Sequence, residues 1–328
     1  MWGNRLGWVI SAVLVGVVAY PLYLGSQPPR VSTPSGAFPN LMASIELPLD
    51  PKGIVPAAMQ EPCDAGEVYR QAMDDYYANT RQYEKYLANT LLAAKERPKG
   101  VELILAASRC SEMKLFARSP IEVLNYKAED PAMQSIYALG RMANQRGMLH
   151  ASNKGSEEAR KFFDPQLARK YFDATFALGY QLYRERLAWS ELEAGLNLME
   201  DAALGLAGLE LQGTNPGRAA DLKHFAEVVR DYKLKQFELY KVVSSIDTNT
   251  VGHYGGDIIA LARSSPEPMW RAEAILALGR MRYNTSRRGD QRAAERELQQ
   301  WTTDPNPAVR AAANAAASLT VQQYRALH

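Results

Sequence analysis

The sequence has few cysteines, few histidines and no large excess of charge of either sign, and each shortage excludes a class of protein. Two cysteines among 328 residues cannot form the dense framework of a small disulfide-rich domain. Lys and Arg number 38 and Asp and Glu 36, so the net charge is +2. This balance gives no electrostatic reason to expect a nucleic acid as partner. A hydrophobic content of 47% is sufficient for a globular core.

No segment shows the alternation of apolar and polar residues that is typical of a β-strand. Glu67–Glu96 contains neither proline nor glycine, and its apolar residues recur at helical spacing. We therefore predict an all-α protein. Beyond that first long helix, helical patterns are found at 101–117, 131–150, 165–186, 188–212, 218–245, 256–264, 268–283, 290–302 and 307–325.

The first 25 residues form a predicted transmembrane anchor. Leu6–Leu24 has no charged residue and is long enough to span the hydrocarbon core, about 30 Å. Because Arg5 and the α-amine precede this segment, we expect the N-terminus inside and the body in the periplasm, on the outer side of the inner (cytoplasmic) membrane. The alternative is a cleaved signal peptide.

Ala12 and Gly16 form a small-xxx-small pair within this segment. Such a pair allows two membrane helices to approach closely, so both residues are candidates for packing against a partner helix. The alternative is that the pair has no partner, since small residues are common in apolar helices.

Cys63 and Cys110 are predicted to form a disulfide, because an exported chain meets an oxidising environment. Two buried free thiols are the alternative. No C-x-x-C or C-x-x-C-H motif is present, and no histidine has metal-binding spacing. We therefore expect no metal site, no haem and no other cofactor.

Residues 26–62 are predicted to form an extended, proline-rich arm, because proline is incompatible with regular helix. The arm also contains apolar residues, for which a free spacer has little need. It is therefore expected to lie along a surface, either of the chain's own helices or of a partner, and the alternative is a plain spacer. Phe38, Leu41 and Ile45 are the candidate partner contacts.

The C-terminal part contains a repeat with a period of 39 residues, in which Pro268–Ala272 aligns with Pro307–Ala311. Asp304–Ala312 resembles the start of a HEAT-repeat helix, with the pattern D-P-x-P-x-V-R-x-A-A. The earlier copy has Trp270 at the valine position. The resemblance covers about residues 256–325 and implies an α-solenoid of paired helices, a fold that usually binds proteins.

The middle of the chain is more loosely similar to tetratricopeptide-like arrays. Gly140 and Gly179 follow Ala-Leu pairs, and each is expected where two helices approach closely. The predicted organisation is therefore an anchor (1–25), an arm (26–62), a body of helical hairpins (63–250) and HEAT-like repeats (251–328).

Acidic residues at Glu191, Glu193, Glu200 and Asp201 are the candidates for acid–base chemistry. Superhelical lytic transglycosylases combine a helical solenoid with a catalytic glutamate, but their Glu-Ser motif is absent here. A solvated acidic helix face is the preferred interpretation, and no catalytic residue is predicted.

Arginines near the C-terminus, including Arg280, Arg287 and Arg288, are candidates for a positive ridge that contacts an acidic partner or lipid headgroups. Ordinary surface arginines are the alternative. Together the patterns favour a single-pass scaffold, without enzymatic activity, that stabilises a larger membrane protein complex. The alternatives are an exported helical enzyme acting on glycans and a soluble periplasmic binding protein released by signal cleavage.

Overall fold

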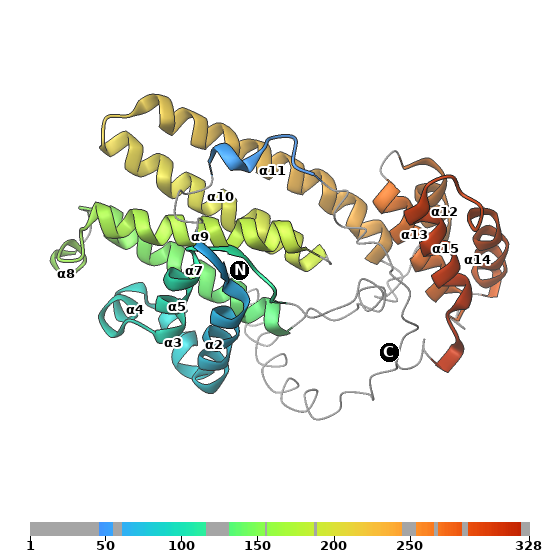
Figure 1. Ribbon diagram of the computed structural model, residues 1–328, viewed down its shortest axis with the longest axis horizontal. Coiled ribbons are helices and arrows are strands. Elements are labelled where there is room, and N and C mark those ends of the chain that lie inside the picture. The colour runs from blue at the N-terminus through green and yellow to red at the C-terminus, as the bar shows by residue number, and fades with distance from the viewer. Residues whose placement is uncertain are drawn as a thin grey trace, which may run out of the picture. The chain divides into compact units, whose positions relative to one another are not determined.

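The computed structural model describes an all-α protein with thirteen α-helices among its described residues (Figure 1). The chain divides into two units, and the larger one, Ala37–Leu319, contains nearly all of what is described below. The predicted membrane segment lies outside the described residues, and no helix within them is long and apolar enough to cross a membrane. The described residues are 46–54, 61–115, 131–154, 156–186, 189–244, 254–265, 268–283 and 288–322.

The first helical region is a series of short helices, so the prediction of one helix over Glu67–Glu96 is wrong. Breaks occur at Asn79 and Asn89, whose backbones leave the helical conformation. The Asn89 side chain accepts a hydrogen bond from the backbone N–H of Leu92 and so caps the next helix. Asparagine competes for backbone hydrogen bonds in this way, which the apolar periodicity does not reveal. The helices are α2 (Ala65–Ala78), α3 (Thr80–Ala88), α4 (Thr90–Glu96) and α5 (Lys99–Ala107).

Two short parallel strands, β1 (Glu61–Asp64) and β2 (Cys110–Glu112), pair beside these helices. The sequence pattern predicts no strand and a helix over 101–117, whereas α5 ends at Ala107. Strands of three or four residues are too short to show alternation. The predicted disulfide joins the two strands through Cys63 and Cys110. The buried side-chain amide of Gln181 donates to the Cys110 carbonyl at 2.8 Å and so connects β2 to the central helices.

Four long helices form the centre of the body: α7 (Pro131–Ala151), α9 (Pro165–Glu185), α10 (Trp189–Gln212) and α11 (Pro216–Ser244). A short helix, α8 (Glu157–Arg160), precedes α9. All four long helices begin and end within two residues of their predicted limits. Helix α9 packs against both α7 and α10, and α10 packs against α11 (Figure 1).

Glycines set the close crossing of the central helices, as predicted for Gly140 and Gly179. A Cβ atom at Gly179 would lie 2.8 Å from the carbonyl oxygen of Gly195 on α10. The reciprocal Cβ at Gly195 would lie 2.7 Å from the Gly179 carbonyl oxygen. A Cβ at Gly140 would lie 2.9 Å from the Leu198 side chain. A larger residue at Gly179 or Gly195 would meet backbone atoms and force α9 and α10 apart, whereas at Gly140 it would first displace leucine side chains.

The C-terminal helices are α12 (Tyr254–Ser264), α13 (Pro268–Met281), α14 (Arg288–Trp301) and α15 (Pro307–Ser318). Helix α13 packs against α12, α14 and α15. Trp270 and Val309, which occupy the same position in the two copies of the repeat, are 1% and 0% exposed. Both copies therefore direct this position into the core, although the two side chains differ greatly in size.

Residues 46–54 of the arm lie along the chain's own helices, and the last two residues of the arm, Glu61 and Pro62, begin β1. The backbone N–H of Leu47 donates to the Tyr183 hydroxyl at 2.9 Å, and the Leu47 side chain is buried. Leu49 and Ile54 also pack against the main core. The arm was predicted to lie either on the chain's own helices or on a partner, and residues 46–54 lie on the chain's own helices. The candidate contacts Phe38, Leu41 and Ile45 lie outside the described residues.

Candidate functional site

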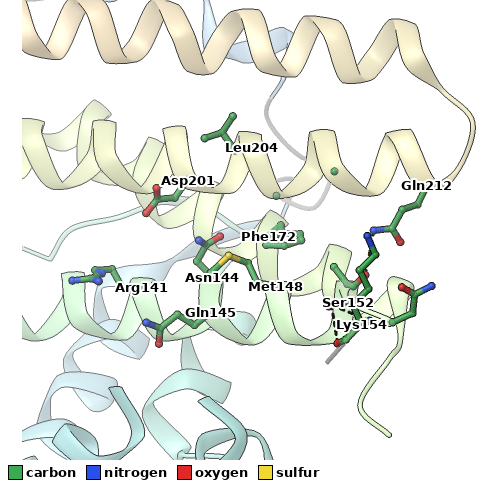
Figure 2. A pocket seen from close by; sticks show the side chains of 14 residues that line it. Arg141, Asn144, Gln145, Met148, Ser152, Lys154, Phe172, Asp201, Leu204 and Gln212 are labelled. Atoms are coloured by element: carbon green, nitrogen blue, oxygen red, sulfur yellow. Dashed lines mark hydrogen bonds between the residues drawn. The ribbon is translucent and has the colours of Figure 1, made fainter. Parts of the chain in front are cut away.

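A groove of about 550 Å³ opens between α7 and α10 (Figure 2). Helix α9, against which both of these helices pack, lies beneath it. This volume lies within the range of ligand-binding clefts, about 300–1,000 Å³. Side chains from α7 line one wall and those from α10 the other, and the residues that follow α7 close one end. The lining residues are Arg141, Asn144, Gln145, Met148, Ala151, Ser152, Asn153, Lys154, Phe172, Asp201, Leu204, Gly205, Gly208 and Gln212.

The ring of Phe172, on α9, supports the groove from below and is only 1% exposed. Two glycines make room for it. A Cβ atom would lie 2.7 Å from the ring at Gly147 on α7 and 2.3 Å from it at Gly205 on α10. By contrast, a Cβ at Gly208 would meet no atom within 4 Å. Gly205 therefore fits the ring, whereas Gly208 leaves empty space in the wall of the groove.

The walls contain two large apolar side chains that remain in solvent. Met148 on α7 is 51% exposed and Leu204 on α10 is 40% exposed. Both line the groove, Met148 from α7 and Leu204 from α10, as Figure 2 shows. An open cleft with apolar walls can bury part of a bound molecule.

Asn144 contributes a polar group that the described part of the protein does not satisfy. The residue is 7% exposed, and no described group donates a hydrogen bond to its buried Oδ1 atom. A buried polar atom without a partner costs about 1–3 kcal/mol, so such atoms need an explanation. Figure 2 places Asn144 between α7 and α10, among the groove-lining side chains.

The groove has charged groups toward both ends. Asp201 and Arg141 lie at the end shown on the left of Figure 2, and Lys154 lies toward the other end. Partial burial raises the pKa of Asp201, the adjacent Glu200 carboxylate raises it further, and the positive charge of Arg141 opposes both effects. Asp201 is the only carboxylate among the described residues that line the groove.

Two of the other acidic candidates, Glu191 and Glu200, are buried, so the interpretation of a solvated acidic helix face is wrong for these two. Glu191 is fully buried and Glu200 is 8% exposed. The Glu200 carboxylate accepts charge-assisted hydrogen bonds from Arg230 at 2.7 Å and Lys233 at 2.9 Å, both on α11. The interpretation fails because α10 packs against α7, α9 and α11, so polar side chains on more than one side of it contact other helices.

Arg280 is also buried, at 8% exposed. With so little surface, it does not contribute an exposed side chain to the predicted positive ridge. Arg287, Ala12 and Gly16 lie outside the described residues. Arg288 begins α14, and its side chain is not among those described.

A second polar cluster lies inside the body, on α5, α7 and α9. The buried guanidinium of Arg146 pairs with Glu102 at 2.7 Å and lies 4.5 Å above the ring of Tyr171. His150 stacks on the same ring, with the ring centres 5.7 Å apart. Its Nδ1 contacts the Phe162 carbonyl, while no described group is a partner for its buried Nε2. Burial lowers the pKa of His150, so the neutral imidazole is favoured.

The groove was not predicted from the sequence, although the two glycines of its α10 wall, Gly205 and Gly208, are a local signal. Within the described residues, no group of His, Cys, Asp and Glu side chains is arranged to hold a metal ion. In comparisons with known proteins, no protein-family model, curated protein or solved structure matches this chain.

Proposed function

We propose that this protein is a membrane-anchored, extracytoplasmic α-solenoid that binds another polypeptide and stabilises a larger membrane complex as an accessory subunit. The observation that carries the proposal is the open groove between α7 and α10. It combines exposed apolar walls with a buried hydrogen-bond acceptor that has no partner among the described residues. A bound ligand would cover the apolar walls and supply a hydrogen-bond donor to the acceptor.

The packing of the C-terminal helices supports the solenoid interpretation. Arg271, in the first copy of the repeat, forms an ion pair with Asp304, at the start of the second copy. Arg310, the equivalent arginine of the second copy, donates to the carbonyl oxygens of Asp304 and Pro305. The two copies thus use the same arginine position to hold the loop between helices, as expected for stacked repeats.

The extracytoplasmic location is supported by the disulfide between Cys63 and Cys110. Disulfides persist in oxidising compartments and are rare in the cytosol. The uncharged segment Leu6–Leu24 is long enough to span a membrane and therefore supplies the proposed anchor. Ala12 and Gly16 then provide the contact with a partner's membrane helix.

A glycan-active enzyme is less well supported by the groove. Hydrolysis of a glycosidic bond generally uses two carboxyl groups that flank the bond. Of the described residues that line the groove, only Asp201 carries one, and Glu200 is held in ion pairs on another side of α10.

Co-purification from native membranes in mild detergent tests the proposal. We expect a stoichiometric partner to accompany the protein, and the yield of that partner to fall when Ala12 and Gly16 are both replaced by leucine. Val18→Leu is the matched control, because an ideal helix places it away from both small residues. A protein that purifies alone, or one that degrades glycans without a partner, contradicts the proposed function.

A further inference from the structure

We infer that the groove between α7 and α10 binds an extended peptide segment of a partner protein, with one apolar side chain of that segment placed against Gly208. The inference rests on the proposed function and deepens it by naming the site and the ligand class. It is drawn from the hydrogen-bonding, shape and charge of the described groove residues.

The Oδ1 atom of Asn144 favours a peptide as the ligand. A buried amide oxygen without a donor is satisfied by an incoming N–H or O–H group. The backbone of an extended peptide presents such N–H groups at regular intervals, because it has no internal helix or turn to occupy them. Gln145 and Gln212 add further amide groups along the same walls. Amide side chains can both donate to and accept from a peptide backbone.

The length and shape of the groove also fit an extended peptide. Its α7 wall extends from Arg141 to Ala151, which is about 15 Å at about 1.5 Å per residue. An extended peptide rises about 3.3 Å per residue, so about five residues fit along this wall. The empty space at Gly208 lies on the same α10 wall as Leu204. An apolar side chain placed there would contact Leu204 and Met148 and remove them from water.

The side chains that line the groove favour a peptide over a glycan as the ligand. Sugar-binding sites commonly place an aromatic face against the apolar face of the ring, as aromatic side chains offer large apolar surfaces. Phe172 is the only aromatic residue among the described groove-lining residues, and it is 1% exposed, so it offers no such face. The exposed apolar surface belongs instead to Met148 and Leu204, flexible aliphatic side chains that adapt to a peptide side chain.

Charge gives the peptide a preferred direction. At one end of the groove the positive charge of Arg141 acts on the Asp201 carboxylate and opposes the rise in its pKa, so the two charges partly offset each other. At the opposite end, no described acidic side chain forms an ion pair with Lys154, whose backbone N–H donates to the Ser152 hydroxyl at 3.2 Å. An acidic residue, or a C-terminal carboxylate, is therefore expected on the Lys154 side of the apolar residue.

The test uses the full-length protein in detergent and a phage-displayed library of random octapeptides. We expect selection of peptides that share one apolar residue followed or preceded by an acidic one. A synthetic peptide of the selected sequence should bind Gly208→Leu at least tenfold more weakly than the unmodified protein, because leucine fills the empty space. Gly217→Leu is the matched control, since a Cβ at this exposed helical glycine also meets nothing within 4 Å and it lies outside the groove. Asn144→Ala should also weaken binding.

Three results would overturn the inference. The first is the absence of any selected peptide, and the second is equal binding to Gly208→Leu and Gly217→Leu when both have the circular dichroism and unfolding midpoint of the parent. The third is equally tight binding of a peptide with the sequence of residues 31–45, which would make the chain's own arm the occupant. If a membrane partner still co-purifies with Gly208→Leu in full yield, the groove assignment fails while the proposed function stands.

Discussion

The same substitution, glycine to alanine, should have opposite effects on stability at two positions three residues apart on α10. At Gly205 the new Cβ would lie 2.3, 2.6 and 2.6 Å from three atoms of the Phe172 ring. The ring is 1% exposed, and a Cβ at Gly147 on α7 would lie 2.7 Å from it, so both neighbouring helices pack closely against the ring. At Gly208 the new Cβ would contact nothing within 4 Å.

The magnitudes follow from two terms. Alanine in a helix interior is favoured over glycine by about 1 kcal/mol at both positions. Overpacking a close-packed core costs about 1–3 kcal/mol, and contacts this short place Gly205→Ala toward the upper end of that range. We therefore expect Gly205→Ala to lower the free energy of unfolding by about 2 kcal/mol, after subtraction of the propensity gain. Gly208→Ala should raise it by about 1 kcal/mol.

Urea denaturation followed by circular dichroism at 222 nm, about the helix minimum, measures both values, provided that the slope m is unchanged. The double variant Gly205→Ala, Phe172→Leu gives a further check. Because leucine removes the ring edge that the new methyl group meets, the two changes should be less destabilising together than the sum of the single changes. Equal signs for the two alanine variants, or strict additivity in the double variant, would refute this description of how α7, α9 and α10 pack.

Three further perturbations test other parts of the structure. Reducing the disulfide, which closes a loop with a sequence separation of 47, should lower the free energy of unfolding by about 4 kcal/mol, measured by denaturation with and without reductant. Because the pKa of His150 is lowered in the folded protein, the unfolded chain takes up a proton at a higher pH than the folded protein does. The contribution of His150 to the free energy of unfolding is therefore present above a pH of about 6.5 and is lost as the pH falls below it. Between pH 7 and 5, His150→Gln should therefore lose less stability than the parent; parallel curves for the two proteins would exclude this role. Arg271→Ala leaves the buried Asp304 carboxylate without its ion-pair partner and should lower the free energy of unfolding by about 3 kcal/mol, a value that a shift under 1 kcal/mol in the urea experiment would contradict.

The sequence predicted the long helices well and the contacts between them poorly. Apolar periodicity over twenty residues placed α7, α9, α10 and α11 within two residues of their limits, since one buried stripe defines a helix from its own sequence. Gly179 was correctly predicted at a close helix crossing, because a missing side chain is a local signal. The breaks at Asn79 and Asn89 were missed, since a capping side chain interrupts a helix without changing its apolar pattern.

Which charged residues are buried, and where a groove forms, depends on which helices pack together. The apolar periodicity of a single helix does not contain that information. Glu200 was predicted to be solvated, and it is buried because α11 supplies Arg230 and Lys233 to neutralise it. Asn144 likewise has an ordinary polar position on α7, and only the approach of α10 makes its Oδ1 a buried acceptor in a groove. The partner and the membrane anchor remain predictions from the sequence.

The most direct test of the central claim is the mass of the protein extracted from its own membranes in mild detergent. Size-exclusion chromatography with light scattering, corrected for bound detergent, gives this mass independently of any assumed partner. The chain alone has a mass of 36.4 kDa. An accessory subunit that binds another polypeptide should elute in a complex whose mass is not a multiple of that value and which contains a second chain at a fixed ratio. A particle of 36.4 kDa, or an integer multiple of it composed of this chain alone, would contradict the account.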